Sequence, residues 1–195
     1  MKLRNYMPVL TAALVACGGG EPADTTQGGS QPAPTAAGLA AAPTGPMTTP
    51  AWYVVDNDAR TVSLTLTAGE TADNNYWNYN GATNGSLAIT VPEGYTVTIV
   101  QENRDPNMAH SVGILPLPAN FAMPPQPNPV FAGAISRNPT SMIDATMPGE
   151  SESITFVAGQ AGSYALVCLI PGHSAIGMWH YFNVAADGQA GIQSR

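Results

Sequence analysis

Three side chains that bind transition metals lie on one short stretch late in the chain. Cys168, His173 and Met178 occur in the run CLIPGHSAIGM, with four residues between each successive pair. A thiolate, an imidazole and a thioether suit copper that cycles between two oxidation states, in a trigonal site of two histidines and one cysteine with a weak axial methionine. The obvious candidate for the second histidine is His110, in the run MAHSVGI. The fold of this chain must therefore bring the segment around His110 close to the loop that contains Cys168.

Alternation of polar and apolar residues predicts a chain made of β-strands. The pattern is strict over residues 61–67 (TVSLTLT) and 86–91 (SLAITV), so each of these strands should bury one face. Further strands are predicted at 95–102, 110–115, 153–157, 162–169 and 178–184. Many short strands joined by Gly and Pro turns, without a convincing amphipathic helix, indicate an all-β Greek-key sandwich or barrel over residues 51–195.

The proline-rich segment 116–147 interrupts the strand pattern. We expect a long connection that packs over one edge of the sheets, with a short helix around 130–136. Its methionines are irregularly spaced, which favours packing or surface cover over a methionine-rich copper site.

The N-terminal residues predict an export signal. A positively charged start is followed by an apolar run that is too short to span a bilayer, and the run LVAC ends at Cys17. This run resembles the lipobox of bacterial lipoproteins, so we expect residues 1–16 to be a lipoprotein signal peptide and Cys17 to be lipidated; an ordinary signal peptide that contains a cysteine is the alternative. Residues 17–50, rich in Gly, Pro, Ala and Thr, predict a disordered, flexible linker. The domain should be exported, periplasmic or at the cell surface, and in contact with a membrane through its lipid anchor.

Net charge and cysteine content restrict the kinds of partner that the chain can bind and the roles that Cys168 can have. Cleavage would remove two of the six basic residues and none of the 13 acidic ones, which changes the net charge from −7 to −9. Such a surface repels nucleic acid, so a partner must be recognised by apolar contact or through its basic surface. With Cys17 lipidated, Cys168 has no cysteine to pair with. An unpaired thiol in an oxidising compartment should be bound to metal or, as the plainer alternative, buried as a structural side chain.

Three stretches resemble the cupredoxin family, and specifically sulfocyanin, with rusticyanin next. They are NYNGATNGSLAI at 78–89, the strand that begins at His110, and YALVCLIPGH at 164–173 continuing through GMW at 177–179. The resemblance implies one type 1 (blue) copper ion and an electron carrier, not an enzyme.

The resemblance also implies roles for individual residues. His110, Cys168 and His173 would be equatorial ligands, and Met178 the axial ligand. Many cupredoxins follow the first histidine with asparagine, whereas this chain has Ser111, whose hydroxyl should change the hydrogen bonding near the thiolate.

Partners follow from the same resemblance. Redox proteins such as cytochromes or a terminal oxidase would dock near His173, whose ring edge should face solvent. An apolar rim is expected around it, formed by Ile170, Pro171, Ala175, Ile176 and Met178. A tethered carrier needs no second subunit, so we expect a monomer.

Other functions remain open at this point. A periplasmic copper chaperone or storage protein would bind copper(I) through several methionines. An oxidase or nitrite reductase would need more than the three histidines present. Zinc could bind the same cysteine and two histidines, but the methionine would be unexplained. We expect His180 to be structural or at the surface, because the ligand set is complete without it, and Trp77, Tyr79 and Trp179 to belong to the core rather than act as electron relays.

Overall fold

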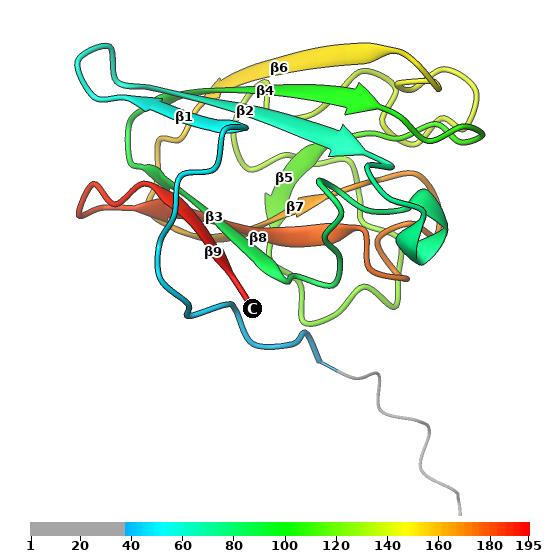
Figure 1. Cartoon of the computed structure of the whole chain (residues 1–195), viewed down its shortest axis with the longest axis horizontal. Helices are drawn as coiled ribbons and strands as arrows, with labels where there is room; N and C mark the ends of the chain where they lie inside the picture. The colour runs from blue at the N-terminus through cyan, green and yellow to red at the C-terminus, as the bar shows by residue number, and fades with distance from the viewer. Residues whose placement is uncertain (1–37) are drawn as a thin grey trace, which may run out of the picture. The chain divides into compact units, whose positions relative to one another are not determined.

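The computed structural model describes residues 38–195, which form nine strands and one short turn of helix, η1 (Figure 1). The predicted signal peptide, Cys17 and the first part of the predicted linker lie outside the described residues. In chain order, the elements are β1 Tyr53–Asp56, β2 Thr61–Ala68, η1 Asp73–Tyr76, β3 Leu87–Pro92, β4 Thr96–Asn103, β5 Gly113–Pro116, β6 Ser151–Val157, β7 Gly162–Val167, β8 Trp179–Ala185 and β9 Gly191–Ser194. No helix within residues 38–195 has the length and apolar character needed to cross a membrane.

The strands form two layers. One sheet has the order β1-β2-β4-β6 and the other β5-β7-β8-β3-β9, and Figure 1 shows them one above the other. The β2–β4 and β3–β8 pairs are parallel, and the remaining pairs are antiparallel. The all-β sandwich predicted from the sequence is confirmed.

Alternation along the strands builds the core between the sheets. In β4, every second residue is buried, from Val97 and Ile99 onward, because successive side chains of a strand point to opposite faces. Phe182 of β8 faces the same core, whereas its neighbour Tyr181 belongs to a second apolar cluster on the other side of that sheet. The second sheet is therefore buried on both faces.

The proline-rich connection supplies part of that second cluster. Phe121 and Leu117 pack there against Trp179 and its neighbours, so this part of the connection covers a face of the sheet. The expected packing over an edge is made by Ile135, which bridges to Gly113 of the edge strand β5. The helix expected around 130–136 is absent. Val130 N–H donates to Ile114 O, and Ile114 N–H donates to Ala134 O, so the backbone pairs with β5 instead of with itself.

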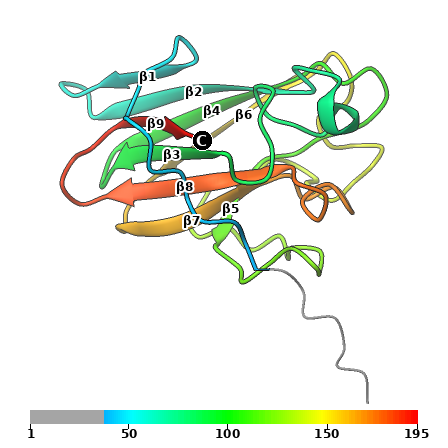
Figure 2. The ribbon, with the colours of Figure 1, turned by 60° about the horizontal axis from the view of Figure 1, so that its bottom comes forward.

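The folded domain begins earlier than the predicted boundary at residue 51. Thr48 forms an antiparallel bridge with Ile192 of β9, with N···O distances of 2.9 and 2.8 Å. Tyr181 also donates a hydrogen bond from its hydroxyl to Ala40 O. Residues 39–48, which we call the N-terminal strap, therefore lie on the second sheet and are not part of a flexible linker (Figure 2).

Candidate metal centre

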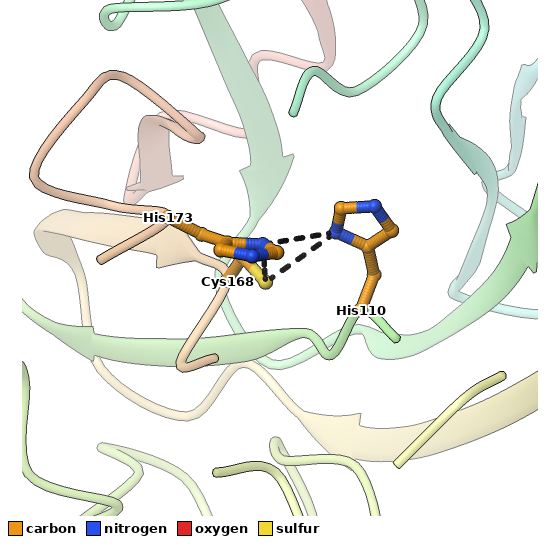
Figure 3. Close-up of side chains that lie close together, drawn as sticks. All are labelled: His110, Cys168 and His173. Atoms are coloured by element: carbon orange, nitrogen blue, oxygen red, sulfur yellow. Dashed lines mark hydrogen bonds between the residues drawn. The ribbon is translucent and has the colours of Figure 1, made fainter. Parts of the chain in front are cut away.

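The fold brings His110, Cys168 and His173 together at one point (Figure 3). His110 Nδ1 is 3.8 Å from Cys168 Sγ, His173 Nδ1 is 3.5 Å from the same sulfur, and the two nitrogens are 3.2 Å apart. The centre of a triangle with these sides is about 2 Å from each corner, the distance at which nitrogen and sulfur donors hold a metal ion. All three side chains are fully buried. The donor set and its spacing fit a single copper ion.

Backbone hydrogen bonds shape the loop that carries most of the ligands. The loop joins β7 to β8, and it is closed where Cys168 N–H donates to Met178 O at 3.1 Å and Met178 N–H donates to His173 O at 3.0 Å. His173 N–H donates to Ile170 O at 3.1 Å, which makes a tight turn between the cysteine and the histidine. Met178 is buried at the point where the loop re-enters β8. These backbone hydrogen bonds fix the shape of the loop that carries Cys168, His173 and Met178.

Asp105 fixes which nitrogen of His110 is available to a metal. His110 Nε2–H donates to Asp105 Oδ2 at 2.9 Å, so Nδ1 carries the free lone pair that points to the cluster. The carboxylate is buried, and its other oxygen accepts hydrogen bonds from Asn107 N–H at 2.8 Å and Met108 N–H at 3.1 Å. Asp105 was not among the functional residues predicted from the sequence. Its signal is an aspartate that opens an Asp-Pro-Asn turn shortly before a ligand histidine.

Burial sets the protonation states of the three donors. It lowers the pKa of His110 despite the opposing effect of Asp105, and it lowers the pKa of His173 to about 3, with a further contribution from His110. Both imidazoles are therefore neutral, which is the form that binds metals. Burial raises the pKa of Cys168, so the metal-free site holds a thiol that releases its proton when a metal binds.

Ser111 joins the histidine segment to the cysteine loop. Its Oγ accepts a hydrogen bond from Leu169 N–H at 2.9 Å and lies 3.8 Å from Cys168 Sγ. Its carbonyl oxygen accepts a hydrogen bond from the hydroxyl of Tyr79, a fully buried core residue. The structure thus places Ser111 beside the Cys168 sulfur, as predicted from the sequence.

The surroundings of His173 differ from the sequence-based expectation. Its ring is fully buried, so the expected solvent-facing edge is wrong. Trp77 stacks on it, with ring centroids 3.8 Å apart and an interplanar angle of 19°. Of the five residues expected to form an apolar rim, Ile170 and Met178 are buried, and three are exposed: Pro171, Ala175 and Ile176.

His180 lies outside the cluster. Its ring is buried on β8, and burial lowers its pKa to about 4. Its Nδ1 accepts a long hydrogen bond from Leu87 N–H at 3.4 Å. These contacts agree with the structural role expected for this residue.

Comparison with known proteins places this site in a family. A family model described as the sulfocyanin (SoxE) domain matches residues 50–190. A sulfocyanin from Sulfolobus acidocaldarius is 33% identical over 126 residues, which cover 62% of this chain and 61% of that protein. The match therefore spans less than two thirds of the relative's length.

Two solved structures are also similar. Reduced auracyanin from Roseiflexus castenholzii is 28% identical, and the alignment covers 63% of this chain and 96% of auracyanin with a TM-score of 0.42. A structure of the copper protein rusticyanin is 23% identical, with 69% of this chain and 87% of rusticyanin covered and a TM-score of 0.46.

Proposed function

Because the chain belongs to the sulfocyanin family, we propose that it is a mononuclear type 1 copper protein that shuttles single electrons between membrane-associated redox partners, in a respiratory chain. The observation that carries the proposal is the buried triangle of His110, Cys168 and His173. Copper bound there supplies a one-electron couple between copper(I) and copper(II).

The protein's own contribution is to hold the ligands still. His110 precedes β5, and the other two ligands lie on the β7–β8 loop, so two separate parts of the sandwich fix their positions. Asp105 and Ser111 restrain the two parts through hydrogen bonds to His110 and Leu169. Ligands that are fixed in this way need little rearrangement when the charge of the site changes, which favours rapid electron transfer.

The surface near the β7–β8 loop fits a docking role. Pro171, Ala175 and Ile176 are exposed there, and exposed apolar side chains that lie together mark contact sites. The chain is strongly acidic, so we propose that its partners, cytochromes or a terminal oxidase, present apolar or basic surfaces.

The proposed location depends on the N-terminus. The run LVAC supports export and attachment of a lipid to Cys17, which would tether the domain at a periplasmic or cell-surface membrane. Mass spectrometry of the mature N-terminus tests this proposal: a diacylated Cys17 is expected, and an unmodified N-terminus would contradict it. Export of the Cys17→Ala variant as a free soluble protein would agree with the tether.

Redox cycling distinguishes an electron carrier from the main alternative, a copper chaperone or storage protein. We expect the copper-loaded protein to accept and release one electron per chain reversibly, with its colour lost and regained, and to keep its copper throughout. A chaperone would instead release copper(I) to a chelator or acceptor protein on reduction. Loss of copper in the reduced form would contradict the carrier function.

A further inference from the structure

Trp77 lies between solvent and His173, a candidate metal ligand whose side chain is not exposed. His173 is fully buried, whereas Trp77 is partly exposed and stacks on the His173 ring at 3.8 Å. The far nitrogen of His173, Nε2, is buried and has no hydrogen-bond partner among residues 38–195. A molecule that approaches this side of the site therefore meets the indole before it meets the imidazole.

The chain before Trp77 adopts an unusual conformation. Asn74, Asn75 and Tyr76 have positive φ angles of 53°, 59° and 63°, although left-handed backbone costs roughly 1–2 kcal/mol per residue that is not glycine. Two successive asparagines reduce that cost, because asparagine tolerates this region better than most residues. Both views show this turn, η1, beside the β7–β8 loop (Figures 1 and 2).

Side-chain amides hold this strained turn in place. Asn74 Nδ2 donates to Trp77 O at 2.8 Å, and Asn78 Nδ2 donates to Thr71 O at 2.8 Å and to Asp73 O at 2.9 Å. The indole N–H of Trp77 is buried and finds no hydrogen-bond partner within the described part of the chain. A hydrogen bond of the indole therefore does not explain its position, and backbone strain that persists at a candidate site is typical of a functional constraint.

We propose that Trp77 is the contact through which electrons enter and leave the metal centre by way of His173. The inference rests on the proposed function of electron carrier. One electron passes from the reduced molecule to the oxidised one, no bond forms or breaks, and no proton moves. Trp77 serves as a bridge of overlapping ring orbitals and is neither oxidised nor reduced.

The test is the rate of electron self-exchange between the reduced and oxidised forms of the full chain, measured from NMR line broadening. Both partners are the same protein, so the driving force is zero and a change in potential does not alter the comparison. High salt should be used, because the acidic copies repel each other. Trp77→Phe keeps an aromatic ring on His173, whereas Trp77→Leu keeps an apolar side chain without one. Trp52→Leu is the matched control, since Trp52 is also a partly buried tryptophan packed on the main core.

We expect Trp77→Leu to exchange roughly tenfold more slowly than the wild type, because positioned contact between reacting groups is lost. Trp77→Phe should keep most of the rate, and Trp52→Leu should leave it unchanged. A Trp77→Leu protein that keeps its visible copper band but exchanges as fast as the wild type, or faster, would overturn the inference and leave the proposed function intact. A wild-type protein without that band would overturn both.

A measurement on the protein without copper tests separately whether Trp77 covers His173. The reaction of His173 with diethyl pyrocarbonate, followed by peptide mass spectrometry, should be slow in the wild type and faster in Trp77→Leu. Equal rates in the two proteins would show that Trp77 does not cover His173, and the inference would fail.

Discussion

A single hydrogen bond decides how His110 presents itself to a metal. Asp105 accepts from Nε2–H at 2.9 Å, and both groups are buried, so no water competes for the bond. Carboxylates that orient ligand histidines in this way also raise the basicity of the ligand. The same carboxylate caps two backbone N–H groups of its own turn. Asp105 thus couples the shape of the turn to the direction of the ligand nitrogen.

Asp105→Asn should weaken copper binding by about tenfold, because the neutral amide stabilises the oriented imidazole less than a carboxylate does. A competition titration with a copper chelator measures the change. Asp187→Asn is the control, since Asp187 is exposed and accepts a similar backbone hydrogen bond from Gln189 N–H. An unchanged affinity in Asp105→Asn would contradict the orienting role.

Ser111→Ala should have two effects. Leu169 N–H is buried and would lose its acceptor, so the free energy of unfolding should fall by about 1–3 kcal/mol in denaturant titrations. The visible copper band should shift, because the hydroxyl 3.8 Å from Cys168 Sγ is removed. Ser136→Ala removes a comparable acceptor, that of Val112 N–H, and should lower stability without moving the band. A band in the same place in both variants would count against a role for Ser111 at the thiolate.

The sequence identified residues whose type and spacing carry the chemistry, and it missed those that act through geometry. His110, Cys168, His173 and Met178 were recognisable because few side chains bind copper, and three of them share one loop. Ser111 was found by its position after His110. Asp105 acts only through the atoms that the fold brings near it. Trp77 was assigned to the core, because its stacking on His173 depends on the fold. The burial of His173 could not be foreseen for the same reason, since it depends on a turn almost 100 residues upstream.

At the scale of the element, the end of β2 supports the metal centre. Gly69 directly follows β2 with a φ angle of +72°, and a Cβ atom there would lie 2.6 Å from the backbone nitrogen of Asp105. Such a contact forces the backbone to move, because a neighbouring main chain cannot swing away as a flexible side chain can. The end of β2 and the glycine that follows it therefore help to place the carboxylate that holds His110.

Gly69→Ala should consequently weaken copper binding as well as stability. Gly94→Ala is the matched control, since Gly94 also has a positive φ of +78° and its added Cβ would meet only the side chain of Arg60, at 3.0 Å. The control should lose about 1 kcal/mol from backbone strain alone, and its copper affinity should not change. Chemical denaturation and chelator competition on both variants measure these effects, and equal copper affinities would refute the support role of β2.

Strands were predictable from the sequence where polar and apolar residues alternate over a long stretch. β2, β3, β4, β6, β7 and β8 lie close to their predicted ranges, because one or both faces are buried in a regular pattern. β1 and β9 were missed because they have four residues each, too few to show a period. The helix expected at 130–136 was wrong because pairing with β5 outweighs local preference, and Gly133 adopts a φ of +85°, outside the helical region.

For the whole molecule, the N-terminal strap protects an edge of the sandwich. β9 is the last strand of its sheet, and Thr48 pairs with its free side at Ile192. An uncovered sheet edge invites pairing with other chains. The sequence predicted a linker here because the composition is poor in large apolar residues, whereas the strap is held by hydrogen bonds that composition does not reveal.

A chain that begins at residue 51 should be less stable than one that begins at residue 38. Four hydrogen bonds to β9 would be lost: those from Thr48 N–H and from the Thr48 hydroxyl to Ile192 O, from Ile192 N–H to Thr48 O, and from the side chain of Gln193 to Gly45 O. At about 1 kcal/mol each, the free energy of unfolding should fall by about 2–4 kcal/mol. Denaturant titration of the two chains measures the difference, and coincident unfolding curves would show that the strap adds no stability.

The most direct test of the account is the visible absorption spectrum of the protein during titration with copper(II), beside Cys168→Ser. We expect one intense thiolate-to-copper band that saturates at one copper per chain in the wild type and is absent in Cys168→Ser. A wild-type protein that stays colourless, or that needs more than one copper to reach its full absorbance, would contradict a single type 1 centre built from His110, Cys168 and His173.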